Sequence, residues 1–224
     1  RSDRRRGRPV TRRSTAAAAT PQHRLQHQMA ARPRAGLFFD AGGPVNPKTE
    51  LWLIRHAEST GNRDNVLQGQ ADLPLSPLGH RQARALADRL LKAHRRTPFA
   101  ALYASDLMRT RETADSIGLA LNLRVVCDRR LREIDIGRWS GLTPAQIAEA
   151  HPTEWTQWQG RDPSLRRGGG ESYADSHVRI RPAISEIAQR HAAMRVLIIT
   201  HGGECDPLRR SSAEPNRRWG ASWR

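Results

Sequence analysis

LWLIRHAEST, residues 51–60, is the stretch that decides the fold. Its apolar first half, Leu51 to Ile54, predicts a buried strand, and that strand ends in Arg55 and His56. Open α/β sheets bind ligands at the carboxyl ends of their strands, where this pair is expected. An arginine holds phosphate through planar, bidentate hydrogen bonds, and an imidazole can attack it. The stretch therefore predicts a phosphate site.

Three further side chains complete such a site. The apolar segment 195–200 predicts another strand, and His201 follows it directly. Arg109 lies just past the strand expected at 99–103, near a helix start, where backbone N–H groups also favour anions. Glu133 offers a carboxylate beside this cationic pocket that can serve as acid and base.

Strand and helix signals alternate along the middle of the chain. Ser76 and Pro77 fit the N-cap and the first position of a helix, and Thr143 and Pro144 begin another in the same way. This alternation favours an α/β fold of three layers (α/β/α) with a mostly parallel central sheet. We expect strands at 51–55, 99–103, 125–126 and 195–200, and further helices at 108–121 and 172–192, the latter kinked at Pro182.

Length and charge bound the class of protein. The 224 residues are enough for one ordinary domain with tails. The formal net charge is +16, and residues 1–50 contribute much of it, with eleven Arg and Lys against three acidic residues. The excess that remains in the middle favours an anionic substrate, although a solvated basic surface would have the same composition.

The cysteines and the hydropathy indicate the compartment. Cys127 and Cys205 match no metal or redox spacing, which indicates a reduced, cytoplasmic protein without a disulfide framework. No run of about 18 apolar residues occurs, so we expect no membrane span. The histidines lack helical zinc spacing, so we expect no metal.

Both ends differ from the middle, which is the predicted domain at 50–203. Residues 1–49 are rich in Arg, Pro, Ala and Gly without a helical or strand period, which predicts a disordered basic N-terminal extension. A transit peptide, or translation that begins at Met29, is the alternative. No aromatic residue interleaves the arginines before Phe38, so we expect no nucleic-acid binding. Residues 204–224 form an atypical basic tail.

Taken together, the motifs resemble those of the histidine phosphatase superfamily, with its phosphoglycerate mutase-like fold. Arg55-His56-Ala57-Glu58 resembles the signature Arg-His-Gly-Glu motif, with alanine in place of glycine. The resemblance spans 51–203, about two thirds of the chain, and favours the phosphatase branch. The other matching blocks, in the family's order, are Ser105 to Arg109, Leu131 to Gly141, Gly169 to Ser172 and Ile199 to Gly203.

The resemblance implies a role for each candidate residue. His56 is the expected nucleophile, which becomes a phosphohistidine. Glu133 is expected to protonate the leaving oxygen and then to take a proton from water. No metal or other cofactor is implied, because the cations already present bind the phosphate. The residues expected around the phosphoryl oxygens are Arg55, Asn62, Arg109 and His201.

The resemblance stops after Gly203. The family continues with an amphipathic helix and a final strand, whereas this chain has Pro207, Pro215 and scattered arginines with almost no apolar period. We therefore expect the fold to lack its last helix and strand. Such a helix would bury about five large apolar side chains, worth on the order of 10 kcal/mol before entropy. Its loss predicts weak or absent activity, unless the tail is replaced or a partner covers that face of the sheet.

The leading functional hypothesis is a phosphomonoester hydrolase that acts through phosphohistidine on small phosphorylated metabolites. The close alternative is phosphoryl transfer of the phosphoglycerate mutase type, although mutases of the family usually carry longer insertions over the site. A non-enzymatic alternative is a truncated, inactive homologue or a basic-armed binding protein. The sequence indicates neither the individual substrate nor the oligomeric state.

Overall fold

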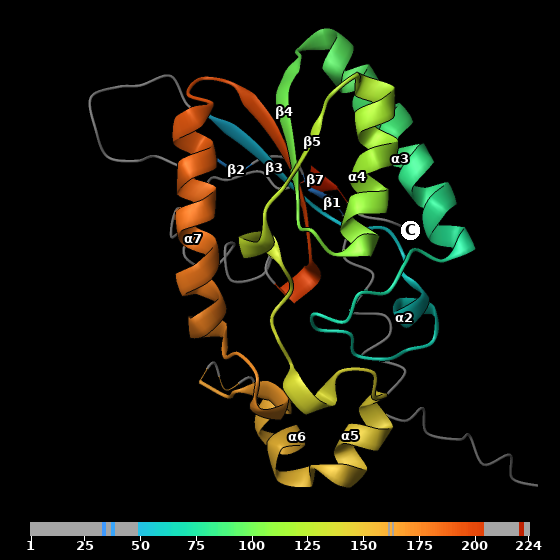
Figure 1. The fold of residues 1–224 in the computed structure, drawn as a ribbon, viewed down its shortest axis with the longest axis vertical. Helices are drawn as coiled ribbons and strands as arrows, with labels where there is room; N and C mark the ends of the chain where they lie inside the picture. Colours follow the sequence, from blue (N-terminus) through green and yellow to red (C-terminus); the bar gives the residue numbers. More distant parts are fainter. Residues whose placement is uncertain are drawn as a thin grey trace, which may run out of the picture.

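The computed structural model describes residues 49–160, 162 and 164–203, together with two-residue strands at 33–34, 37–38 and 220–221. In this part of the chain a central sheet lies between helices on both faces (Figure 1). No helix among these residues is long and apolar enough to cross a membrane. The expected three-layer α/β/α fold is confirmed.

The sheet is built on parallel strands. β6 (Arg195–Thr200) lies at the centre, between β3 (Glu50–Arg55) and β4 (Phe99–Ala104), and β5 (Val125–Cys127) extends the sheet beyond β4. A short strand, β2 (Leu37–Phe38), pairs antiparallel with β3 at the opposite edge. Strands that are buried on both faces consist of continuous apolar runs, and this is why the sequence of β6 predicted a strand.

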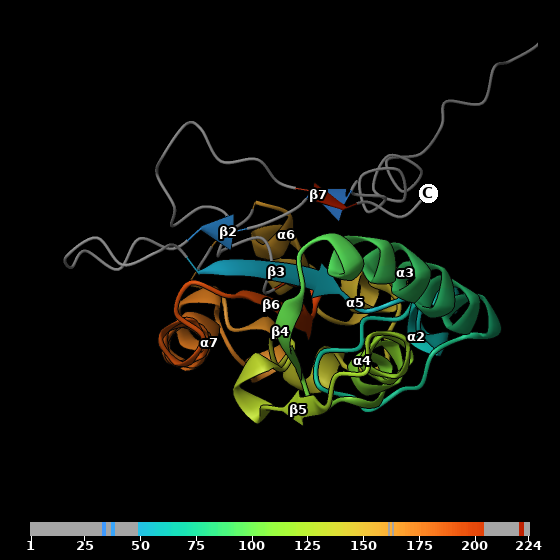
Figure 2. The ribbon, with the colours of Figure 1, turned by 90° about the horizontal axis from the view of Figure 1, so that it is seen from above.

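Helices cover both faces of the sheet. α3 (Pro77–Arg96) and α4 (Met108–Leu121) pack on one face, and α7 (Tyr173–Arg190) packs on the other (Figure 2). Successive side chains of a strand point to opposite faces. In β6, Leu197 and Ile199 accordingly join the core under α3 and α4, whereas Val196 and Ile198 join the core under α7.

The helices begin where the sequence signals them. Ser76 caps α3 by accepting a hydrogen bond from the Gly79 N–H at 3.0 Å. Thr143 begins α5 (Pro144–Ala150), and Ser172 begins α7, each with a capping box. α7 ends at Arg190, slightly before the expected end at 192, and continues through Pro182 as one helix. The expected kink at Pro182 stays a prediction.

A small helical layer lies beyond the carboxyl ends of the strands, at the lower end of Figure 1. It contains α5 and α6 (Pro152–Gln159). Trp139 is fully buried there, with its ring centroid 6.5 Å from that of Trp155 and 6.0 Å from that of Trp158. The remaining short helices are α2 (Thr60–Arg63), η1 (Arg129–Leu131), η2 (Gly137–Trp139) and η3 (Arg167–Gly169).

The two ends of the chain differ in one respect from the expectation. Instead of a wholly irregular extension, Leu37–Phe38 forms β2, and β1 (Pro33–Arg34) pairs with β7 (Gly220–Ala221) of the tail. The open edge of β3 explains β2, because its unpaired N–H and C=O groups accept a further strand. Thr49, the last residue of the extension predicted at 1–49, is buried and donates to the Ala188 carbonyl at 3.2 Å. The rest of that predicted extension lies outside the described residues. So does most of the tail at 204–224, with its expected lack of a last helix.

Candidate active site

Parallel strands that end side by side bring the candidate residues together. Arg55, at the end of β3, lies opposite Thr200, at the end of β6. The His56 N–H donates to the Thr200 carbonyl at 2.9 Å, which continues the pairing by one residue. His56 and His201 therefore leave the sheet as neighbours. β4, on the other side of β6, leads into the helix that carries Arg109.

His56 is buried, and one hydrogen bond orients its ring. Nδ1 lies 2.6 Å from the Ala57 carbonyl oxygen. Because a carbonyl oxygen can only accept, Nδ1 carries the proton and Nε2 keeps its lone pair. Burial, together with the charges of Arg55 and Arg109, holds the pKa of His56 well below its usual range. The imidazole is therefore neutral at physiological pH, and the lone pair of Nε2 is available for reaction.

His201 is fully buried and faces His56. The two ring centroids are 5.2 Å apart, with an angle of 61° between the ring planes. Neither ring nitrogen of His201 has a hydrogen-bond partner among the residues that the structure describes. Burial, and then the charge of Arg109, holds its pKa well below the usual range. An unpaired buried polar group is unfavourable by itself, so a ligand oxygen here would supply a missing partner.

Arg109 is 1% exposed and is held by the backbone of a loop. Nη1 donates to the Ala71 carbonyl at 2.7 Å, and Nη2 donates to the Gly69 carbonyl at 2.8 Å. Its Nε is buried without a partner in the described part of the chain. Burial lowers the pKa of Arg109 to about 10, and Glu133 opposes this shift. Arg109 is therefore still cationic at neutral pH.

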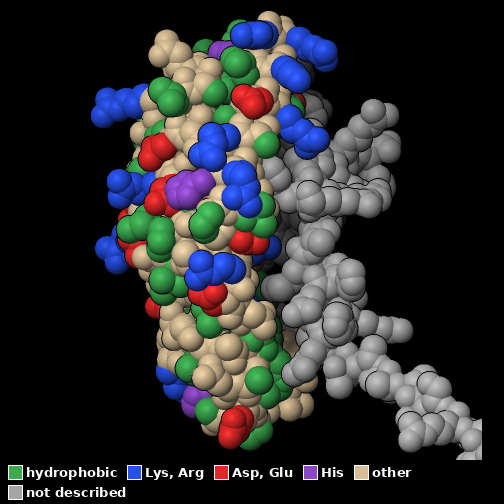
Figure 3. All heavy atoms as spheres, turned by 90° about the vertical axis from the view of Figure 1, so that its right-hand side faces the viewer, with side chains coloured by type: hydrophobic (Ala, Val, Ile, Leu, Met, Phe, Trp, Pro, Cys, Tyr) green, Lys and Arg blue, Asp and Glu red, His purple; other side chains and the backbone are tan. Residues whose placement is uncertain are grey.

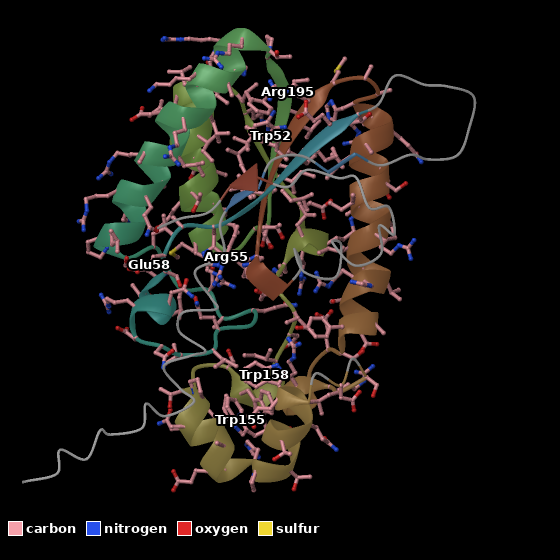
Figure 4. The ribbon with its side chains drawn as sticks, turned by 180° about the vertical axis from the view of Figure 1, so that it is seen from behind. Trp52, Arg55, Glu58, Trp155, Trp158 and Arg195 are labelled. Atoms are coloured by element: carbon pink, nitrogen blue, oxygen red, sulfur yellow. The ribbon has the colours of Figure 1, made fainter. Side chains whose placement is uncertain are left out.

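Arg55 supplies a second cation at the same edge. Figure 4 shows Arg55 between the upper part of the sheet, which carries Trp52, and the helical layer that carries Trp155 and Trp158. A Cβ added at Gly202 would lie 3.2 Å from Arg55 Cζ, so the guanidinium lies against the backbone just after His201. No hydrogen bond or ion pair joins this guanidinium to another described residue.

Glu133 reaches the site from the irregular segment between η1 and η2. Its Oε1 accepts the Ile134 N–H at 3.0 Å, and Oε2 accepts the Gly203 N–H at 3.3 Å. A Cβ added at position 203 would lie 2.3 Å from Oε1. The glycine after His201 therefore leaves the space that the carboxylate occupies.

Asn62 is the candidate residue whose role as a phosphate ligand stays a prediction. It is exposed in α2, and Oδ1 accepts hydrogen bonds from the Ser59 N–H at 3.1 Å and from the Ser59 hydroxyl at 2.8 Å. The side chain thus completes the capping box of α2. No described contact joins Asn62 to the histidines or to Arg109.

The geometry agrees with the resemblance of the sequence motifs. The model of the histidine phosphatase superfamily (branch 1) matches residues 51–213. The chain belongs to this superfamily. The match begins at the first residue of the apolar run before Arg55 and includes all the candidate side chains.

Several superfamily relatives are similar over about two thirds of their length. Phosphoserine phosphatase 1 of Hydrogenobacter thermophilus is 36% identical over 152 residues, which are 68% of this chain and 70% of that protein. Glucosyl-3-phosphoglycerate phosphatase of Mycobacterium tuberculosis is 36% identical, with the same two shares. Phosphoglycerate mutase-like protein 4 of Arabidopsis thaliana is 32% identical over 69% of this chain and 66% of that protein. The relatives therefore include both phosphatases and mutase-like proteins.

Solved superfamily structures share the fold. The mycobacterial glucosyl-3-phosphoglycerate phosphatase in complex with VO3 gives a TM-score of 0.64 at 34% identity, over 71% of this chain and 78% of that one. YhfR of Bacillus stearothermophilus gives 0.66 at 33% identity, over 73% and 79%. These similarities support the arrangement of strands and helices around the site.

The structure adds supporting residues to which the sequence analysis assigned no role. The Ala57 N–H donates to Thr113 Oγ1 at 3.1 Å, and the Thr113 hydroxyl donates to the Arg109 carbonyl at 2.7 Å. Thr113 thereby links the loop after His56 to the helix of Arg109. Arg179 of α7 binds the backbone beside Glu133. An arginine on a helix has no sequence signal that separates such a role from a solvated one.

Metal binding was not expected from the sequence. Among the residues with a described position, no group of three or more His, Cys, Asp or Glu side chains could hold a metal ion. That the protein works without a metal stays a prediction.

Proposed function

We propose that this protein is a phosphomonoester hydrolase that works through a phosphohistidine on His56. One observation carries the proposal: His56 is a buried, neutral imidazole beside His201 and Arg109, and among the described residues nothing pairs with its Nε2, with either ring nitrogen of His201 or with Arg109 Nε. Arg55 adds a second cation. A group with several anionic oxygens around one electrophilic atom, such as a phosphoryl group, satisfies all these side chains at once.

In the first half-reaction, Nε2 of His56 attacks phosphorus while the bond from phosphorus to the leaving oxygen breaks. Arg55, Arg109 and His201 hold the phosphoryl oxygens and stabilise the charge of the transition state. Glu133 in its acid form gives a proton to the leaving oxygen, so that an alcohol departs. The Nδ1–H bond to the Ala57 carbonyl stabilises the positive charge that the phosphorylated ring acquires.

In the second half-reaction, a water molecule attacks phosphorus from the side opposite the P–N bond. The Glu133 carboxylate takes a proton from this water, and the electrons of the P–N bond return to Nε2. Inorganic phosphate leaves, and His56 is again neutral. Glu133 ends in the acid form with which the cycle began.

Small phosphorylated metabolites are the proposed substrate class. Two relatives are named as phosphatases of phosphoserine and of glucosyl-3-phosphoglycerate, and each of these substrates is a small phosphomonoester with a carboxylate. They are the first compounds to test.

We also propose a cytoplasmic location, because Cys127 is a free cysteine, as in reducing compartments.

A mutase is the second candidate, because a mutase-like protein is among the relatives. In that case the phosphoryl group on His56 returns to a substrate hydroxyl instead of passing to water. Measurement of inorganic phosphate release against isomer exchange on phosphoglycerates separates the two activities. We expect phosphate release to dominate.

The test is to trap the intermediate. Purified protein is mixed with a radiolabelled phosphomonoester and stopped in base, in which phosphohistidine survives, and a second sample is treated with acid, which removes it. We expect base-stable, acid-labile label on the wild type and none on His56→Ala. His80→Ala is the matched control, because His80 is a partly exposed histidine of α3. Equal labelling or equal hydrolysis by His56→Ala would overturn the proposal.

A further inference from the structure

Arg179 of α7 binds the backbone that leads to Glu133. Its Nη1 donates to the carbonyl oxygens of Arg130 and Arg132, both at 2.8 Å. Its Nη2 lies 3.4 Å from the Glu133 carbonyl oxygen, which it also faces as a donor. One guanidinium therefore holds the chain at three points at and before Glu133.

Glu171 completes the arrangement on the other side of Glu133. It accepts two hydrogen bonds from Arg179, at 3.0 Å from Nε and at 2.8 Å from Nη2. The same carboxylate accepts the Asp135 N–H at 2.9 Å. The side chains of Arg179 and Glu171 are only 20% and 22% exposed, so this bidentate ion pair is largely shielded from water. The pair thus fixes the backbone both before and after Glu133.

The segment that carries Glu133 depends on such contacts. Residues 132–136 belong to no helix or strand, so no ladder of backbone hydrogen bonds fixes them. Backbone groups in partly buried irregular segments need side-chain partners. Arg179 and Glu171 supply them here, with Gln70, whose Nε2 donates to the Glu133 carbonyl at 3.2 Å.

We infer that the ion pair of Arg179 with Glu171 positions the Glu133 carboxyl group against the leaving oxygen of the substrate. The inference rests on the proposed function, because it concerns the proton that Glu133 donates. Arg179 and Glu171 are positioning residues: they act through Glu133 and are not assigned a contact with the substrate. A displacement of a catalytic group by about 1 Å can cost on the order of 100-fold in rate, so the bracing governs catalysis as well as stability.

The experiment compares esters whose leaving groups need a proton to different degrees. Nitrophenyl phosphate releases a stable anion without help, whereas alkyl phosphates need a proton on the leaving oxygen. We expect Arg179→Lys, which keeps the charge but loses the planar fork, to lower kcat on alkyl phosphates by about 100-fold, a typical general-acid contribution. For the same variant we expect a far smaller loss of kcat on nitrophenyl phosphate and little change in KM. We expect Glu133→Gln to show the same difference between the two classes of ester.

Two further variants keep the inference testable. Glu171→Gln preserves the shape of the side chain, so a similar but smaller selective loss is expected even if Arg179→Lys does not fold. Glu186→Gln is the matched control, because Glu186 lies on the same helix and forms an ion pair with Arg130 at 2.8 Å without a bond to the backbone of 132–135. We expect its leaving-group dependence to equal that of the wild type.

The outcomes separate the inference from the proposed function. Equal losses of Arg179→Lys and Glu171→Gln on both classes of ester, beside a selective loss of Glu133→Gln, overturn the positioning role alone. A wild type without hydrolysis, or a Glu133→Gln variant without selectivity, overturns the acid role of Glu133 and the inference with it. A selective loss in all three variants, absent from Glu186→Gln, supports the inference.

Discussion

Two buried histidines dominate the chemistry of the site. His56 and His201 are surrounded by protein and by the positive charges of Arg55 and Arg109, and both effects disfavour a protonated ring. A neutral His56 is what a nucleophile requires, whereas the unfolded chain exposes both rings to water. The same residues therefore link catalysis and stability to pH.

The free energy of unfolding is expected to fall as the pH falls below about 6.5, the usual pKa of histidine. In that range the unfolded state binds protons that the folded state, with its lowered histidine pKa values, does not bind. Each such histidine contributes a slope of about 1.4 kcal/mol per pH unit. Urea unfolding at several pH values checks this. His201→Gln should have the shallower slope, and parallel profiles of the two proteins would contradict the expectation.

At the scale of single residues, the sequence predicted which side chains meet but not how each is held. Arg55, His56 and His201 follow strands whose ends are neighbours, so their proximity follows from the fold. Asn62 was predicted from the resemblance alone, and the structure uses its side-chain oxygen to cap a helix. A short amide can serve either purpose, and the sequence does not distinguish them.

Among the elements, η2 and η3 meet through their glycines. Gly168 has a φ of 56°, and a Cβ there would lie 2.3 Å from the Ile136 carbonyl oxygen. This close contact joins the segment after Glu133 to the loop before α7. It gives Gly168 a packing role between these two segments.

Gly168→Ala is expected to destabilise the protein by about 3 kcal/mol or more, because it adds both a positive-φ strain and a backbone clash. Gly141→Ala is the matched control: Gly141 has a φ of 84°, but nothing lies within 4 Å of its added Cβ. Strain alone should cost this control about 1 kcal/mol. Thermal or urea unfolding measures both variants. If they lose the same stability, the contact between η2 and η3 contributes nothing.

Helix boundaries were predictable because capping is a local signal. Ser76, Thr143 and Ser172 begin helices with hydrogen bonds to backbone N–H groups within three residues. α4 begins without a local cap. Leu107 at its N-cap position makes no capping hydrogen bond, and the Met108 N–H instead donates to Asp72, which lies far away in the sequence. Such a cap depends on the folded chain and cannot be predicted from neighbouring residues.

At the scale of the whole molecule, most of the net positive charge in the middle of the chain lies on one helix. α3 carries six Arg and Lys against one Asp, and all six basic side chains are exposed. Figure 3, which looks onto the side of α3 and α4, shows Lys and Arg spread among acidic and apolar side chains rather than gathered in one patch. The sequence left two explanations for the basic excess: an anionic substrate or a solvated basic surface. For α3, the structure favours the solvated surface.

Neutralising this surface should hardly affect catalysis. For Arg84→Gln combined with Arg89→Gln and Lys92→Gln, we expect kcat/KM to change by less than about threefold at low ionic strength, because exposed charges are well solvated. Stability should stay within about 0.5 kcal/mol. Kinetics at low and high salt provide the check. A large loss at low salt that vanishes at high salt would instead indicate that α3 steers the anionic substrate.

The sequence by itself determined the main strands and helices along the chain, the apolar faces of the sheet and the five side chains now proposed for the site. The strands and helices follow from local periodicity and capping, and four of the side chains follow from positions near strand ends. Glu133 follows from the resemblance of its motif. Only the tertiary structure decided that His56 Nδ1 is bonded to a carbonyl oxygen, that His201 has no partner within the described part of the chain, and that Arg179 and Glu171 bind the backbone on both sides of Glu133. These features depend on burial and on contacts between residues far apart in the chain, which no local pattern records.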